Sequence, residues 1–136
     1  MQISLILERD SDGDWQATAE TPGLFISTIA PTVAAVEQNA RELIADYLAH
    51  EGQTDARWAG VDAKTVEFEH LYDVQEIFDA HPELNVNALA RRMDMNPSLL
   101  RQYASGSKHP SEKMAMKIQE AIRELGRALA RTAIYA

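Results

Sequence analysis

The chain has 136 residues, of which 46% are hydrophobic and 25% are charged, and this balance excludes an intrinsically disordered protein. It contains no cysteine, which excludes disulfides and thiolate metal sites and fits a reducing cytoplasm. No apolar run reaches the about 18 residues of a membrane span, and the first residues lack the pattern of a signal peptide. We therefore expect a cytoplasmic protein without a membrane partner.

Charge is divided unevenly along the chain, whose net charge is −8. Residues 1–70 carry four basic and thirteen acidic side chains, whereas residues 85–136 carry nine basic and four acidic ones. An acidic domain is repelled by phosphate, so it must face away from DNA or face a basic partner. The simplest interpretation is two domains with different tasks, residues 1–70 and residues 71–136.

The first residues have the pattern of a β-hairpin. Residues 1–8 alternate between apolar and other side chains, as in a half-buried strand. Ile6 interrupts the alternation, which indicates that part of this strand is covered on both faces. Residues 10–14 are rich in Asp and Gly and predict a turn, after which residues 15–20 return as a second strand.

A third strand, a helix and a fourth strand follow. Pro22-Gly23 marks a turn before the strand at residues 24–28. Thr32 caps a helix whose apolar side chains trace one stripe over residues 33–48, and residues 66–68 form a strand. This order predicts an α+β fold, in which a small antiparallel sheet with one helix (β-β-β-α-β) precedes an all-α domain.

Four acidic residues near the first turn invite comparison with a nuclease metal cluster. Two-metal chemistry needs carboxylates fixed on rigid elements, but Glu8, Asp10, Asp12 and Asp14 follow a strand end and a turn. Asp is favoured in turns because it hydrogen-bonds nearby backbone, so a solvated turn is the better interpretation. The four histidines are scattered. We therefore expect no catalytic residues, no metal and no cofactor.

Three short motifs of this half resemble the HicB family, the antitoxins of bacterial toxin–antitoxin pairs. They are Asp12-Gly13-Asp14-Trp15, Thr21-Pro22-Gly23-Leu24, and a helix that opens at Thr32 and ends Ile44-Ala45-Asp46-Tyr47-Leu48. The resemblance implies a degenerate ribonuclease H-like fold without nuclease activity. It also implies that this domain binds a small basic toxin that cleaves mRNA.

The second half reads as a set of helices. Asp73 and Glu76 form a capping-box-like start to a helix that Pro82 ends. Ser111 caps a long helix near the C-terminus. Its apolar stripe continues beyond Gly126, further than a small helical domain needs. The last members are expected to contact another subunit or the first domain: Leu129, Ile134 and Tyr135.

Two helix starts in quick succession occupy residues 85–106. Asn85 caps the first helix, and Asp94 lies where the chain must turn, since Asp tolerates a left-handed conformation. Asn96 is a second N-cap, followed by Pro97 at the first helical position, and Gly106 ends the helix. Two short helices joined by a turn of three or four residues form a helix-turn-helix.

The same segment resembles the DNA-binding domains of Cro and the lambda repressor. Leu89-Ala90, Met93 and Met95 match the family's pattern, whereas Asp94 replaces its turn glycine and Val86 replaces a bracing Gln. The resemblance implies that the second helix enters the major groove of DNA.

The candidate DNA-binding residues lie at the two helix starts, on the second helix and in the loop after it. Arg pairs with guanine and Gln with adenine, whereas helix starts and loop cations meet phosphate. They are Asn85, Asn96, Pro97, Ser98, Arg101, Gln102, Ser107 and Lys108.

Three hypotheses of function follow. The first is an antitoxin that binds a small basic toxin and represses its own operon by binding double-stranded DNA. The second is a stand-alone dimeric transcription regulator whose first domain serves oligomerisation or ligand sensing. The third, an enzyme of the ribonuclease H type, is the least favoured. Because one such unit reads only a few base pairs, we expect a homodimer or larger homo-oligomer.

Overall fold

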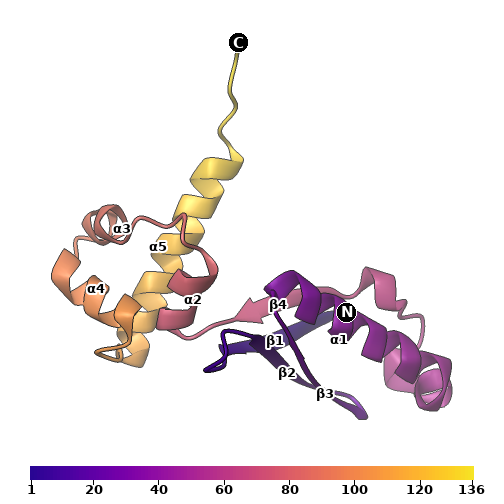
Figure 1. The fold of residues 1–136 in the computed structure, drawn as a ribbon. Coiled ribbons are helices and arrows are strands. Elements are labelled where there is room, and N and C mark those ends of the chain that lie inside the picture. The colour runs from indigo at the N-terminus through magenta and orange to yellow at the C-terminus, as the bar shows by residue number, and fades with distance from the viewer. The chain divides into compact units, whose positions relative to one another are not determined.

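The computed structural model describes residues 1–136 and contains a four-stranded mixed sheet and five α-helices, an α+β architecture (Figure 1). The chain divides into two compact units, here called the first unit (Met1–Asp73) and the second unit (Val74–Ala136). This division lies three residues beyond the boundary expected from the sequence. Tyr72 stays with the first unit because its ring packs edge-on against Trp15 and His70.

The first unit consists of the sheet, one α-helix and a connection of short 3-10 turns. The strands are β1 (Gln2–Arg9), β2 (Trp15–Thr21), β3 (Leu24–Ala30) and β4 (Glu67–Leu71), and the helix is α1 (Val33–Ala49). Between α1 and β4 the chain forms 3-10 turns at Glu51–Thr54, Ala56–Trp58 and Ala63–Thr65.

The sheet has the strand order β3-β2-β1-β4, and β4 pairs with β1 in parallel, from Gln2 opposite Glu67 to Ile6 opposite Leu71. The expectation of an entirely antiparallel sheet was therefore wrong. Two hairpins make β1 and β3 run the same way, and α1 then returns the chain to the end where β3 began. A strand after such a helical crossover runs parallel to the strand before it, so β4 matches β3 and β1.

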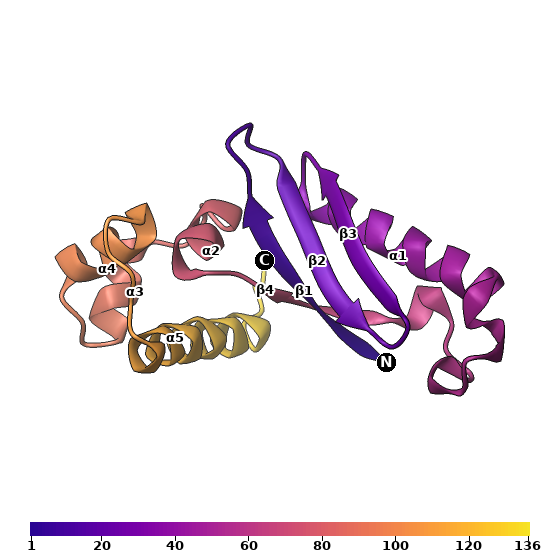
Figure 2. The same ribbon diagram turned by 90° about the horizontal axis from the view of Figure 1, so that it is seen from below.

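One face of the sheet forms the core of the first unit (Figure 2). Thr32 caps α1 as predicted, its Oγ1 accepting a hydrogen bond from the Ala35 N–H at 3.1 Å. Val36, Ala40 and Ile44 recur at four-residue spacing and are fully buried. Helix α1 packs on β2 and β3, and the strand side chains that are fully buried include Leu5, Leu7 and Ile26.

The opposite face of the sheet carries no helix of this unit, and Ile6 on it is exposed. The expectation that the first strand is covered on both faces is therefore not met within the first unit. A strand is buried on both sides when helices cover both faces of its sheet. The first unit has a single α-helix, which covers one face only.

The connection between α1 and β4 is held by side chains rather than by regular structure. The indole of Trp58 is buried, packs edge-on against Tyr47 and donates its Nε1–H to the Pro22 carbonyl at 2.6 Å. Arg41 donates to the carbonyls of Ala63 and Val66 at 2.6 and 2.9 Å. These bonds satisfy backbone that no strand or helix pairs.

The second unit is entirely helical. It contains α2 (Val74–Ala80), α3 (Val86–Arg92), α4 (Pro97–Ser105) and α5 (Glu112–Ala130). Its core draws on all four helices: Phe78, Leu89, Ala90, Met93, Met95, Leu100, Tyr103, Ile118 and Ala121. Ser111 caps α5 as predicted, accepting from the Met114 N–H at 3.2 Å.

The apolar side chains of α5 become exposed toward the C-terminus. Leu129 is exposed, and Ile134 and Tyr135, which follow the helix, are almost fully exposed. No helix of the structure combines the length and apolar character that crossing a membrane requires.

Candidate nucleic-acid interface

A tight turn sets α4 against α3. Four residues separate the helices, and the Met95 N–H donates back to the Ala90 carbonyl at 2.8 Å. Asp94 has a φ of 54°, the only positive φ at a non-glycine residue, so the left-handed conformation predicted for it is confirmed. Met93 and Met95 on either side are buried, which fixes the direction in which the chain re-emerges.

Helix α4 begins as its sequence predicts. Asn96 accepts a hydrogen bond from the Ser98 N–H at 2.8 Å, and Pro97 occupies the first helical turn. Leu100 and Tyr103 are buried beneath the helix, whereas Ser98 on the other side is exposed. The start of α4 is thus anchored by its apolar face and offers its polar face to solvent.

Arg101 is exposed on the same side, and a residue of α3 holds it. Its Nη1 donates to Oδ1 of Asn87 at 2.5 Å, across fourteen positions of sequence. A guanidinium has five N–H donors in a planar fork, so this bond leaves the edge formed by Nε and Nη2 free for a second, bidentate acceptor. Asn87 was not among the residues selected from the sequence.

Gln102 differs from its expected placement, because it is half-buried rather than fully outward. Its backbone carbonyl organises the following loop, accepting bonds at 3.2 Å from the Ser107 hydroxyl and from the Lys108 N–H. Gly106 makes that loop possible: its φ is 82°, and a Cβ there would collide with the Gln75 side chain.

The structure gathers seven of the eight selected residues on α4 and its flanking positions. We call this set the α4 surface: Asn96, Pro97, Ser98, Arg101, Gln102, Ser107 and Lys108. Asn85 lies apart at the start of α3, where its Oδ1 accepts from the Ala88 N–H at 2.9 Å. This capping bond leaves both amide N–H donors of Asn85 available to a ligand.

Arg91 and Arg92 add exposed positive charge at the end of α3, whose C-terminal carbonyls favour cations. No acidic side chain belongs to the α4 surface. An arrangement of this kind offers donors and positive charge to anions and hydrogen-bond acceptors, and it holds no nucleophile paired with a base.

The acidic turn of the first unit is organised by its own backbone. Oδ1 of Asp10 accepts from the N–H groups of Asp12 and Asp14, both at 2.9 Å. Nowhere in the chain do three His, Asp or Glu side chains gather in a way that could hold a metal ion. The turn predicted at residues 10–14 is therefore present, with Asp10 as its local acceptor.

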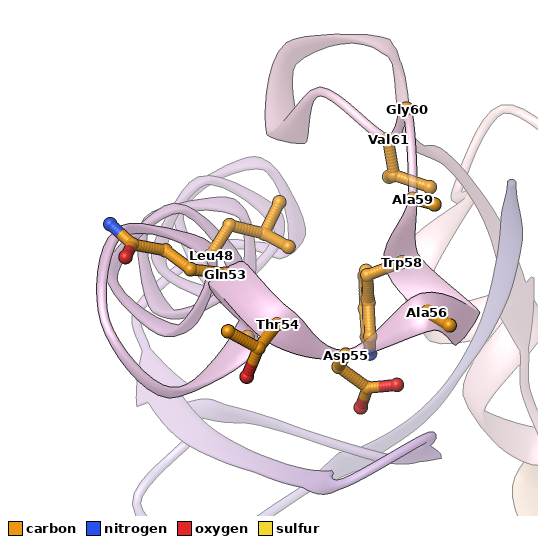
Figure 3. Close-up of a pocket in the computed structure, with 10 residues that line it drawn as sticks. Leu48, Gln53, Thr54, Asp55, Ala56, Trp58, Ala59, Gly60 and Val61 are labelled. Carbon is orange, nitrogen blue, oxygen red and sulfur yellow. The ribbon is translucent and has the colours of Figure 1, made fainter.

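A shallow depression of about 370 Å³ lies over the 3-10 turns after α1 (Figure 3). Its only ionisable side chain is Asp55, which is already engaged by Arg57 at 2.8 Å and by the Tyr47 hydroxyl at 3.1 Å. The hydrogen bond from Arg57 lowers the pKa of Asp55 to about 2, whereas burial and the bond to Asp55 raise the pKa of Tyr47. These groups brace the turn and leave no acid or base poised for catalysis.

The chain has no match among protein-family models, curated proteins or solved structures.

Proposed function

We propose that the protein is a sequence-specific DNA-binding regulator, and specifically the antitoxin of a toxin–antitoxin pair. In this proposal the second unit represses the operon from double-stranded DNA, and the first unit binds a small basic toxin that cleaves mRNA. The protein acts in the cytoplasm as a homodimer or larger assembly and is not an enzyme.

The observation that carries the DNA-binding part is the exposed polar side of α4. A helix that reads base edges must be fixed from behind by apolar contacts while its first two turns stay free. Leu100 and Tyr103 supply the contacts, and Ser98 and Arg101 lie on the free side. The width of the major groove, about 12 Å, admits one such helix.

The contact between Asn87 and Arg101 supports a defined role for the arginine. Recognition of guanine uses two parallel N–H donors directed at O6 and N7. The bond from Nη1 to Asn87 occupies one side of the guanidinium and leaves the Nε and Nη2 edge free. Arg101 is then oriented before it meets DNA, so that less side-chain entropy is lost on binding.

The flanking polar groups suit the DNA backbone. Lys108 follows α4 in a loop fixed by the Gln102 carbonyl, where its cation can reach a phosphate. Such contacts position the helix without reading sequence. Two copies are needed for useful affinity, with half-sites about 34–36 Å apart, and the exposed apolar side chains at Leu129, Ile134 and Tyr135 are candidates for contact between copies.

The antitoxin part depends on the HicB resemblance together with the charge of the first unit. Four basic and thirteen acidic side chains in residues 1–70 suit a basic partner and oppose DNA binding by this segment. The alternative, a stand-alone regulator, needs no such partner.

The DNA-binding part is tested by gel shift on the DNA upstream of the gene, beside random DNA of equal length. Arg101→Ala is expected to lose about 1–3 kcal/mol of specific binding, which is about 5- to 150-fold, and to relax the base preference at one position. Arg131→Ala, an exposed arginine at the end of α5, is the matched control and should keep the preference. Equal behaviour of the two variants would refute the reading role of α4.

The antitoxin part is tested by co-expression with the proteins that neighbouring genes encode, among which a toxin partner should be small and basic. A stable complex that also suppresses the partner's RNA cleavage supports the antitoxin. If the chain binds DNA but forms no complex with such a protein, the stand-alone regulator is favoured.

A further inference from the structure

The uncovered face of the sheet in the first unit displays large apolar side chains. Ile6, Phe25, Ile29 and Leu71 come from three strands and are 46%, 64%, 55% and 41% exposed. Ile6 and Leu71 are register partners on adjacent strands, so their side chains lie side by side. Exposed apolar groups that gather in this way mark an interaction site more often than scattered ones do.

We call this surface the open face, meaning the strand positions that point away from α1. By strand alternation they are Gln2, Ser4, Ile6, Glu8, Gln16, Thr18, Glu20, Phe25, Ser27, Ile29, Glu67, Glu69 and Leu71. Four of these are glutamates, and none is lysine or arginine.

A hollow of about 370 Å³ lies at the middle of the open face. Ile6, Phe25 and Leu71 line it together with Glu20, which is the register partner of Phe25. The surface thus has an apolar hollow beside a carboxylate, with further glutamates at its margins. A partner that fills it must insert an apolar side chain and place cations around it.

A second copy of this chain is a poor occupant of the open face. Two such faces would bring eight glutamates together without a single lysine or arginine from either face. Like charges placed against one another cost free energy, so a symmetric pair through this face is disfavoured. A basic protein gains from the same charges.

We infer that the open face is the surface on which the basic partner protein docks, through an apolar side chain seated between Phe25, Ile6 and Leu71 and Lys or Arg groups over the glutamates. This inference rests on the antitoxin function proposed above and names the surface that carries it.

The test first asks, by co-purification, whether the full chain binds a small basic protein that a neighbouring gene encodes. It then measures by calorimetry how that protein binds four variants of the full chain. Phe25→Lys is paired with Leu43→Lys, since Leu43 is an exposed apolar residue on α1, away from the open face. Glu20→Lys is paired with Glu42→Lys, also exposed on α1. Thermal unfolding and DNA binding of each variant show that the fold is retained.

We expect Phe25→Lys to weaken binding by about thirtyfold or more, as removal of a central anchor does. Glu20→Lys should weaken binding less and reduce its dependence on salt, because a screened charge pair is lost. Both α1 variants should stay within about threefold of the unaltered chain, a change of under about 1 kcal/mol.

Binding that survives both open-face substitutions overturns the inference while leaving the antitoxin function intact. No binding by the unaltered chain removes the antitoxin function, and the docking surface with it. A change in the mass or melting temperature of the isolated chain with Phe25→Lys, without loss of partner binding, assigns the face to a second copy or to the second unit and also overturns the inference.

Discussion

Arg101 illustrates how single polar contacts give a flexible side chain a defined position. A free arginine samples many rotamers, and ordering it costs up to about 2 kcal/mol. Asn87 supplies one acceptor at 2.5 Å from the preceding helix, so part of this cost is met before any ligand arrives. Asn87 therefore belongs to the candidate site as a positioning residue.

Asn87→Ala is expected to weaken specific DNA binding by about threefold to tenfold, since one exposed hydrogen bond to a charged group is worth about 1 kcal/mol. Random DNA should bind unchanged. Asn87→Asp keeps an acceptor and should keep the preference, and Asn87→Ala should add nothing to Arg101→Ala in the double variant. Gel shifts on specific and random DNA measure the affinities of the two Asn87 variants, of Arg101→Ala and of the double variant. If the two losses simply add, Asn87 does not act through Arg101.

Asp94 offers a test of the turn itself. A residue with a Cβ pays for the left-handed conformation, and glycine does not. Asp94→Gly is expected to raise the free energy of unfolding by about 0.5 kcal/mol, and Asp94→Val to lower it by about 1 kcal/mol or more, because a β-branched residue is strained at positive φ. Urea denaturation followed by circular dichroism measures both, and a stabilising valine would contradict the turn geometry.

At the scale of elements, local chemistry made the helix starts predictable. Thr32, Asn85, Asn96 and Ser111 were identified as caps from residue type and the stripe that follows, and each accepts the expected backbone N–H. Such signals succeed because a cap and its partner lie two or three residues apart.

Contacts between distant residues were not predictable in this way. Leu89 and Leu100 belong to the same core and hold α3 against α4, which brings Asn87 to Arg101. No rule of sequence spacing predicts this contact. The burial of Trp58 has no local signal in the sequence, because its partners, Tyr47 and Pro22, lie on other elements. The parallel pairing of β4 could have been predicted, since the expected helix between β3 and β4 is a crossover.

The turn after α1 should show a specific dependence on pH. The pKa of Asp55 falls from 3.8 to about 2 because Arg57 hydrogen-bonds its carboxylate. A carboxylate whose pKa is lower in the folded state adds stability above its unfolded pKa and loses that contribution as pH falls from about 4 toward 2. Asp55→Asn should therefore destabilise the first unit at pH 7, and the difference should shrink toward pH 2.

The measurement for Asp55 is urea unfolding followed by tryptophan fluorescence at a series of pH values. Both tryptophans, Trp15 and Trp58, lie in the first unit, so the signal reports that unit alone. Asp12→Asn, at an exposed turn position, is the control and should follow the unaltered chain. A difference for Asp55→Asn that stays constant with pH would show that Arg57 does not hold the carboxylate.

For the whole molecule, the uneven distribution of charge suits the two tasks proposed for the chain, which a uniformly charged surface would bring into conflict. The chain carries a net charge of −8, yet residues 85–136 hold nine basic and four acidic side chains. Salt screens charges that lie more than about 10 Å apart, so we expect any repulsion between the acidic side chains and DNA to act mainly at low ionic strength. Contacts to phosphate by the second unit should then dominate at physiological salt.

Lys108 allows this division to be measured. Each phosphate contact releases condensed counterions, so the logarithm of the binding constant falls as the logarithm of salt concentration rises. Removing one contact makes this negative slope shallower by about 0.9. Lys108→Ala should weaken binding to specific and random DNA alike and reduce the slope by about one unit, because a phosphate contact carries no sequence information. Lys64→Ala removes the same charge from an exposed position of the first unit and should leave the slope unchanged. Titrations from 50 to 200 mM salt would contradict the assignment if both variants shifted the slope equally, since the effect would then arise from net charge rather than from contact with the α4 surface.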